Sequence, residues 1–166
     1  MHATDPTKPD LGDNTIVFNK LTTPSEIQRT LDEIYVRQHT NQFGRARHAI
    51  LFEPGEYDVD IRLGFYTHVA GLGMLPDDVH VTGHVRVEAD WLAQDGNLGN
   101  TGNATQNFWR AAENLAVTVP PGDIERWAVA QASPYRRMHL RGPLQLWNGS
   151  NGWASGGLIA DTRIEP

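Results

Sequence analysis

The stretch His48-Ala-Ile-Leu-Phe-Glu-Pro-Gly-Glu-Tyr-Asp-Val-Asp-Ile-Arg-Leu63 decides the fold. Its apolar run, 49–52, ends at a turn sequence over 53–56. From Tyr57 onward the residues alternate, and the two sets are Val59, Ile61 and Leu63 on one side and Asp58, Asp60 and Arg62 on the other. Because successive side chains of a strand point to opposite faces, the stretch predicts two short strands joined by a tight turn, each with one buried face.

The same pattern of short alternating runs and turns returns along most of the chain. Further strands are expected within 66–70, 79–82, 85–89, 115–119, 138–140, 144–146 and 158–164, and a Gly/Asn-rich loop over 94–106. The 16 glycines and 10 prolines fall between these runs, as is typical of many short strands connected by turns.

One segment ahead of these strands has helical periodicity instead. Thr23-Pro24-Ser25-Glu26 combines a capping hydroxyl, a proline at the first helical position and a glutamate three residues after the cap. Apolar residues then follow at spacings of four and three. We expect a single amphipathic helix over about 24–38 and a flexible N-terminal arm over 1–15.

A helix followed only by short strands is compatible with a β-sandwich, a jelly roll or a β-helix. Hairpin turns between paired strands are scarce, because Asp95-Gly96 and Asn148-Gly149 lie in longer loops. A helix with one apolar face can also cover the open end of a solenoid core. We therefore predict an all-β fold, a short right-handed parallel β-helix of about four coils with an N-terminal capping helix, as one domain over 16–166.

Composition excludes several classes of function. The formal net charge is −6 and no Lys/Arg cluster occurs, which argues against nucleic acid or an anionic membrane as a partner. The absence of cysteine removes disulfides and thiolate chemistry. The seven histidines show no metal-binding spacing, and no nucleotide-binding loop is present. We expect no metal and no cofactor.

Several segments resemble one group of proteins. Residues 48–57 and 66–73 resemble the opening coils of pectate-lyase-like β-helices. Residues 107–115 and 127–132 are similar to segments of the exo-β-1,3-glucanase (laminarinase) family, and 155–161 to related bacterial secreted β-helix proteins. The resemblance implies the N-terminal part of a longer secreted glycoside hydrolase acting on β-glucan or a related polysaccharide. The catalytic carboxylates of that family lie in later coils, so they are not carried over to this chain.

The residues themselves offer candidate catalytic carboxylates. Glycoside hydrolysis uses two carboxyl groups, about 5 Å apart for retention or roughly 6.5–9.5 Å for inversion. Glu88 and Asp90 lie two residues apart on one strand face, and Asp161 lies near the last strand. The alternative interpretation is a solvated strand face with ion pairs between neighbouring strands.

Candidate sugar-binding residues are aromatic and basic. Sugar rings have apolar faces that stack on aromatic side chains, and Trp147 and Trp153 are expected to be exposed for this purpose. Trp109 and Trp127 are expected to pack in the core or between successive coils. Arg137, His139 and Arg141 share one face of a predicted strand. With Trp147 and Trp153 they are the candidate substrate-binding residues.

Two alternatives to hydrolysis stay open. The chain could be a non-catalytic module that binds a polysaccharide or oligosaccharide through exposed Trp and Arg side chains. It could instead be a structural cap that associates with itself, with a partner or with a C-terminal continuation through its last coil. The basic-then-apolar pattern of a signal peptide is absent from the first residues, and we expect a secreted protein whose signal is not part of this sequence.

Overall fold

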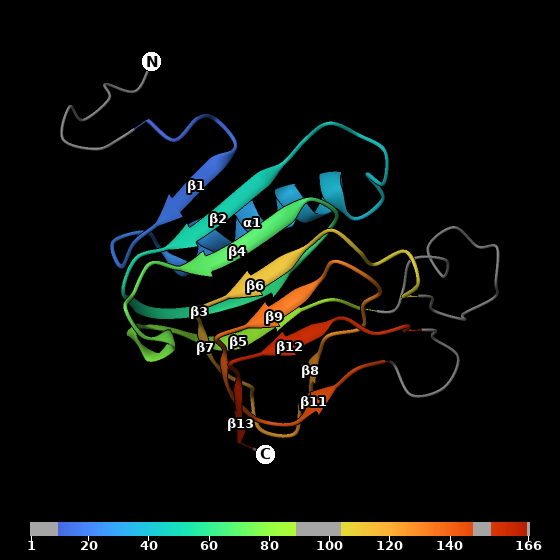
Figure 1. Cartoon of the computed structure of the whole chain (residues 1–166). Coiled ribbons are helices and arrows are strands. Elements are labelled where there is room, and N and C mark those ends of the chain that lie inside the picture. Colours follow the sequence, from blue (N-terminus) through green and yellow to red (C-terminus); the bar gives the residue numbers. More distant parts are fainter. Residues whose placement is uncertain (1–9, 89–103, 148–153, 166) are drawn as a thin grey trace.

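The computed structural model describes residues 10–88, 104–147 and 154–165 (Figure 1). In chain order its elements are β1 (Thr15–Phe18), α1 (Pro24–Gln38), β2 (His48–Phe52), β3 (Gly55–Arg62), β4 (Thr67–Gly71), the 3-10 helix η1 (Pro76–Asp78), β5 (Val79–Arg86), β6 (Ala111–Glu113), β7 (Ala116–Thr118), β8 (Glu125–Arg126), β9 (Pro134–Arg136), β10 (His139–Arg141), β11 (Leu144–Gln145), β12 (Leu158–Ala160) and β13 (Arg163–Glu165).

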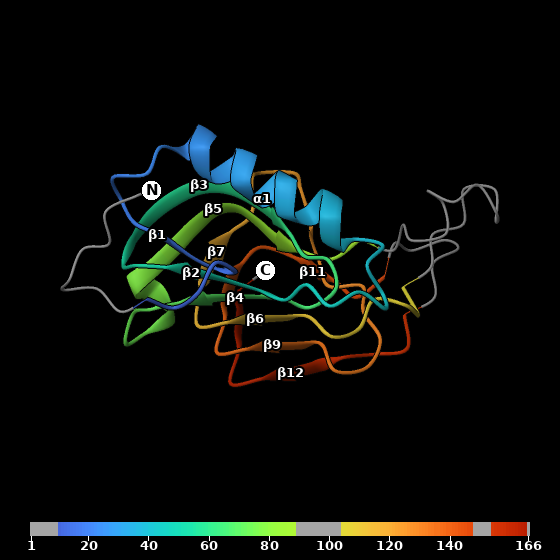
Figure 2. The same ribbon diagram turned by 90° about the horizontal axis from the view of Figure 1, so that it is seen from above.

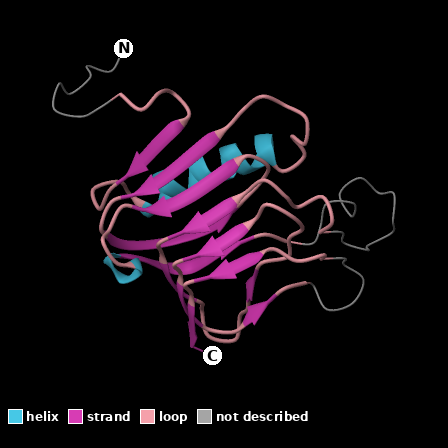
Figure 3. Ribbon diagram, in the orientation of Figure 1, coloured by secondary structure: helices cyan, strands magenta, loops and turns pink. Residues whose placement is uncertain are grey.

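The strands form a parallel β-helix. One sheet, here called sheet A, has the order β1-β2-β4-β6-β9-β12, and a second, sheet B, has the order β13-β10-β7-β5-β3. The short strands β8 and β11 make a third sheet, and all these pairs are parallel. Each coil thus adds one strand to sheet A and the next to sheet B (Figure 3). The predicted β-helix is confirmed, and the sandwich and the jelly roll are ruled out.

The helix α1 begins where its capping sequence predicts. Thr23 Oγ1 accepts a hydrogen bond from the Glu26 N–H at 3.3 Å, and Glu26 Oε2 accepts one from the Thr23 N–H at 3.1 Å. These bonds satisfy two backbone groups that the first helical turn leaves free. The apolar face, with Ile27, Leu31 and Ile34, is buried. The predicted helix over 24–38 is confirmed.

The helix α1 lies beside the outer edge of sheet B and takes the place of a strand there (Figure 2). Gln28 pairs with the edge strand β3 as a neighbouring strand would. Its Nε2 donates to the Asp60 carbonyl at 3.0 Å, and its Oε1 accepts from the Asp60 N–H at 2.8 Å. Asp32 adds an ion pair to Arg62 at 3.2 Å. The helix therefore covers both the apolar end of the core and an exposed strand edge.

Inward-facing side chains of successive strands lie in register and build the core. In sheet B, Tyr57 pairs with Val81 and Val81 with Val117, and all three are buried. In sheet A, Ile50 pairs with Val69, again with both buried. The alternation in the sequence therefore predicts the inward faces correctly, because parallel pairing in register places the inward-facing side chains of neighbouring strands next to one another.

The turn that enters sheet A repeats one backbone conformation from coil to coil. Counting back from the paired residues of sheet A, the positions Arg47, Tyr66, Trp109, Ala132 and Gly156 are equivalent. The last four all have positive φ, at 55°, 58°, 53° and 102°. We call these five positions the turn ladder.

The last coil has no strand beyond it in the described part of the chain. Ile159 pairs with the buried Tyr135, and Ile164 with the buried Leu140. Both isoleucines occupy inward positions, yet they are 40% and 41% exposed. No described strand covers this end of the core, here called the open end, in contrast to the end under α1. Of the helices described here, none has the length and apolarity needed to cross a lipid bilayer.

Candidate functional site

The predicted substrate-binding residues His139 and Arg141 lie on the outer face of β10 and reach the same carboxylate. His139 Nδ1 is 2.8 Å from Asp77 Oδ1, and Arg141 donates to that oxygen at 2.5 Å. Partial burial raises the pKa of Asp77, but the hydrogen bonds from Arg141 and His139 outweigh it and hold the pKa below its usual value. His139 Nε2 also lies 3.5 Å from Glu165.

The third predicted basic residue meets the same loop from another side. Arg137, with φ of 53°, lies in the turn between β9 and β10. It donates to the Met74 carbonyl at 3.1 Å and to Asn114 Oδ1 at 3.4 Å. The structure therefore brings the three basic residues together around loop 74–77, where each already has a partner within the chain. Sequence reasoning missed Asp77, because nothing in a Pro-Asp-Asp turn indicates a contact with a residue 62 positions away.

Glu88 lies at the end of β5 between two guanidinium groups. Arg86 donates to Glu88 Oε1 at 2.5 Å, and Arg126 donates to Glu88 Oε2. Arg86 also forms a bidentate pair with Asp60, and this hydrogen bonding raises its pKa above the usual value despite the opposing effect of burial. The pair with Arg126 connects Glu88 to the next coil, and Arg86, which precedes Glu88 by two residues, connects it to Asp60 in the coil before. A catalytic role for Glu88 stays a prediction, and it requires these pairs to open.

The other predicted carboxylates do not join Glu88 in the described part of the chain. Asp161, with φ of 50°, lies in the turn between β12 and β13. Its described electrostatic neighbour is Arg136, on β9. Asp90, like the candidate sugar-binding residue Trp153, lies outside the described residues. The pairing of Glu88 with Asp90 therefore stays a prediction.

The most strongly buried carboxyl group was not predicted. Glu125, on β8, is fully buried, accepts a hydrogen bond from the Val85 N–H at 2.9 Å and lies 3.1 Å from His84 Nδ1. Burial raises the pKa of Glu125 to about 7. The hydrogen bond to Glu125 raises the pKa of His84, against the effect of burial. The segment Pro120-Pro-Gly-Asp-Ile-Glu125 is polar in sequence and gives no sign of this burial.

The aromatic candidates fall into three different settings. Trp147 is 52% exposed and lines a cavity of about 340 Å³ with Leu146 and Ile159 at the open end of the core. Trp127 is buried, as predicted, and donates to the Ser133 carbonyl at 3.1 Å. Trp109 was expected in the core or packed between coils, and the second alternative holds. It is 44% exposed, but its ring stacks on Tyr66 of the preceding coil, and its left-handed backbone directs the side chain out of the strand pattern.

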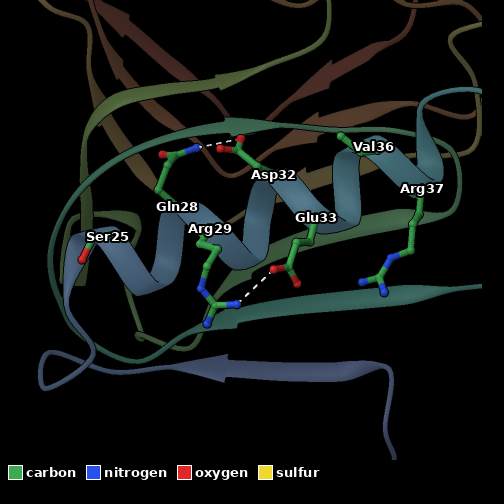
Figure 4. Close-up of a pocket in the computed structure, with 7 residues that line it drawn as sticks. All are labelled: Ser25, Gln28, Arg29, Asp32, Glu33, Val36 and Arg37. Atoms are coloured by element: carbon green, nitrogen blue, oxygen red, sulfur yellow. Dashed lines mark hydrogen bonds and ion pairs between the residues drawn. The ribbon is translucent and has the colours of Figure 1, made fainter.

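A hollow lies along the solvent-facing side of α1 (Figure 4). It measures about 810 Å³ and is lined by Ser25, Gln28, Arg29, Asp32, Glu33, Val36 and Arg37. Figure 4 shows that its polar groups pair along the helix, with Arg29 donating to Glu33 at 3.0 Å. Such exposed pairs at i,i+4 are ordinary features of a helix surface. In the described ranges no cluster of His, Asp and Glu could hold a metal ion.

Stacked parallel coils, a capping helix and charged outer sheet faces define this chain as a parallel β-helix module. The chain is homologous to part of an exo-β-1,3-glucanase from Streptomyces sp. strain SirexAA-E. The two are 50% identical over 157 residues, which is 94% of this chain and 24% of the relative. No family model matches the chain.

Solved structures give the same result. The structure of sacteLam55A from Streptomyces sp. SirexAA-E matches 94% of this chain and 27% of its own, with a TM-score of 0.83 and 50% identity. A variant of sacteLam55A in complex with glucose matches 93% of this chain and 26% of its own, with a TM-score of 0.83 and 49% identity. The resemblance to the exo-β-1,3-glucanase family is confirmed, and the chain spans about a quarter of the relatives it matches.

Proposed function

We propose that this β-helix is part of a secreted protein that hydrolyses β-1,3-glucan, and that the module binds the glucan. The observation that carries the proposal is the 50% identity, at a TM-score of 0.83, with part of an exo-β-1,3-glucanase. The glucose complex of a variant of that relative supports a sugar as the ligand class.

Within the chain, we propose two groups of residues for this role. Glu88, Asp90 and Asp161 are the candidate carboxylates. The candidate sugar contacts are Trp147, Trp153, Arg137, His139 and Arg141, of which the last three converge on loop 74–77. A carboxylate and guanidinium groups beside apolar side chains are suited to sugar hydroxyls and ring faces.

A non-catalytic role in glucan binding is the second candidate. The specific observation in its favour is the double ion pairing of Glu88 with Arg86 and Arg126. Such pairing is typical of a structural carboxylate. In that case the catalytic step belongs to other parts of a longer protein.

The test is incubation of the chain with laminarin, a soluble β-1,3-glucan, and with pectin as a control. Released sugars are measured by mass spectrometry, and binding by affinity electrophoresis. Glucose or short glucans from laminarin support hydrolysis, and their loss in Glu88→Gln or Asp161→Asn identifies the carboxylate. Retarded migration without products supports the binding role. If the chain does not bind laminarin and releases no product from it, the proposal is refuted.

A further inference from the structure

The turn ladder carries a stack of planar side chains that stops part of the way along the molecule. The guanidinium carbon of Arg47 lies 3.3 Å from the centre of the Tyr66 ring. The Tyr66 and Trp109 rings are stacked, with centroids 5.3 Å apart and an interplanar angle of 17°. The next two positions are Ala132 and Gly156, whose side chains cannot continue the stack. Three planar groups are therefore followed by a gap on the same line.

A hollow runs beside the stack and reaches the place where the stack ends. It measures about 270 Å³, and its lining comes from three successive coils: Tyr66, Thr67 and His68 from the first, Trp109, Arg110 and Ala111 from the second, and Ala132 and Pro134 from the third. The Trp109 indole, 44% exposed, forms one wall, and the small side chain of Ala132 leaves space in the next coil. The hollow is smaller than the roughly 300–1,000 Å³ of pockets for drug-sized ligands. Its size is suited to a single ring.

The indole of Trp109 is held in place from two directions. Tyr66 stacks on it, and Phe108 meets it edge-on, with centroids 4.5 Å apart and an angle of 82°. The Tyr66 hydroxyl in turn donates to the Gln42 carbonyl at 2.6 Å. A platform fixed in this way loses little conformational entropy when a ligand stacks on it. The partly exposed His68, 3.1 Å from Glu113, adds polar atoms beside the platform.

From this geometry we propose that the Trp109 platform and the hollow over Ala132 form a sugar-stacking site that takes one glucosyl ring of a β-1,3-glucan. The identity of the sugar rests on the proposed function, and the site on the interrupted stack. A glucosyl ring placed there occupies the position that an aromatic side chain of the next coil would fill. Its apolar face contacts the indole and its hydroxyls reach the polar rim.

Two opposite substitutions test the site with laminarihexaose and isothermal titration calorimetry. Trp109→Ala removes the platform. Ala132→Trp fills the hollow and continues the stack, at a position whose backbone conformation Trp109 already adopts one coil earlier. Both variants are expected to bind the hexasaccharide about tenfold more weakly or worse. Val36→Ala, an apolar truncation on the exposed face of α1, is expected to bind like the native chain.

The outcomes separate the two proposals. Native affinity in both Trp109→Ala and Ala132→Trp overturns the stacking site and leaves the proposed function standing. No binding of the hexasaccharide by the native chain overturns glucan binding itself. Circular dichroism and thermal unfolding check that each variant is folded, and because one substitution removes a side chain and the other adds one, they do not share a common folding defect.

Discussion

The buried pair of Glu125 and His84 predicts an unusual pH dependence of stability. Burial raises the pKa of Glu125 from 4.5 to about 7 in the folded chain. Between these values the folded chain binds a proton that the unfolded chain has released, so stability falls as the pH rises through this window. The difference corresponds to about 3 kcal/mol in the free energy of unfolding. The pKa of His84 is also raised, so the contribution of His84 to stability is likewise lost as the pH rises.

The substitution Glu125→Gln isolates this effect. Glutamine cannot ionise, and its Oε1 can still accept the hydrogen bond from the Val85 N–H. Between pH 5 and pH 8, we expect the native chain to lose about 2–3 kcal/mol of stability relative to the variant. The assay is urea unfolding at both pH values, followed by the fluorescence of the buried Trp127.

A matched control uses a carboxylate with the opposite behaviour. Hydrogen bonds from the side chain and backbone of Thr23 lower the pKa of the exposed Glu26. A lowered pKa keeps this group ionised in the folded chain at both pH values, so Glu26→Gln should change stability by nearly the same amount at pH 5 and pH 8. If the difference in the free energy of unfolding between the native chain and Glu125→Gln is the same at pH 5 and pH 8, the reasoning about the burial of Glu125 is refuted.

Three further predictions concern the fold and the open end. Gln28→Ala removes both hydrogen bonds to the backbone of β3 and should lower the free energy of unfolding, measured in urea, by about 1–3 kcal/mol. Replacing the exposed Arg29 should change this free energy by less than about 0.5 kcal/mol. Equal effects of the two changes would contradict the strand-like role of Gln28. Gly83→Ala places a Cβ 2.1 Å from the Val59 carbonyl oxygen, at φ of 137°, and should lower the free energy of unfolding by about 3 kcal/mol. Gly122→Ala, where the added Cβ has open space, should lower it by about 1 kcal/mol. Similar melting temperatures of the two variants would argue against the close packing at Gly83. The native chain should self-associate in light scattering through its exposed last coil, and Ile159→Asp should make it monomeric; a native monomer would contradict this.

The sequence was sufficient for the features that depend on local chemistry. The cap at Thr23 and the apolar spacing of α1 predict the helix, because its stabilising contacts lie within a few residues. The period-two alternation of β3 predicts its buried face, because strand geometry fixes which side chains share a side.

The features that depend on contacts between coils were not predictable in the same way. The burial of Glu125 results from the placement of the next coil beside β5, where its carboxyl group meets the Val85 N–H and His84. Trp109 is apolar and follows Phe108, but its positive φ turns it outward. The approach of Asp77 to His139 depends on the register of parallel strands, which a single sequence does not encode in any local pattern.

The difference between the two ends of the molecule has a consequence for folding. Each coil contacts its immediate neighbours, so stability passes from coil to coil as in a one-dimensional lattice with nearest-neighbour coupling. The end under α1 is anchored by a helix that can form early, whereas β12 and β13 have a neighbour on one side. Local unfolding of this chain should therefore begin at β12 and β13, and amide hydrogen exchange should slow progressively from these strands toward α1.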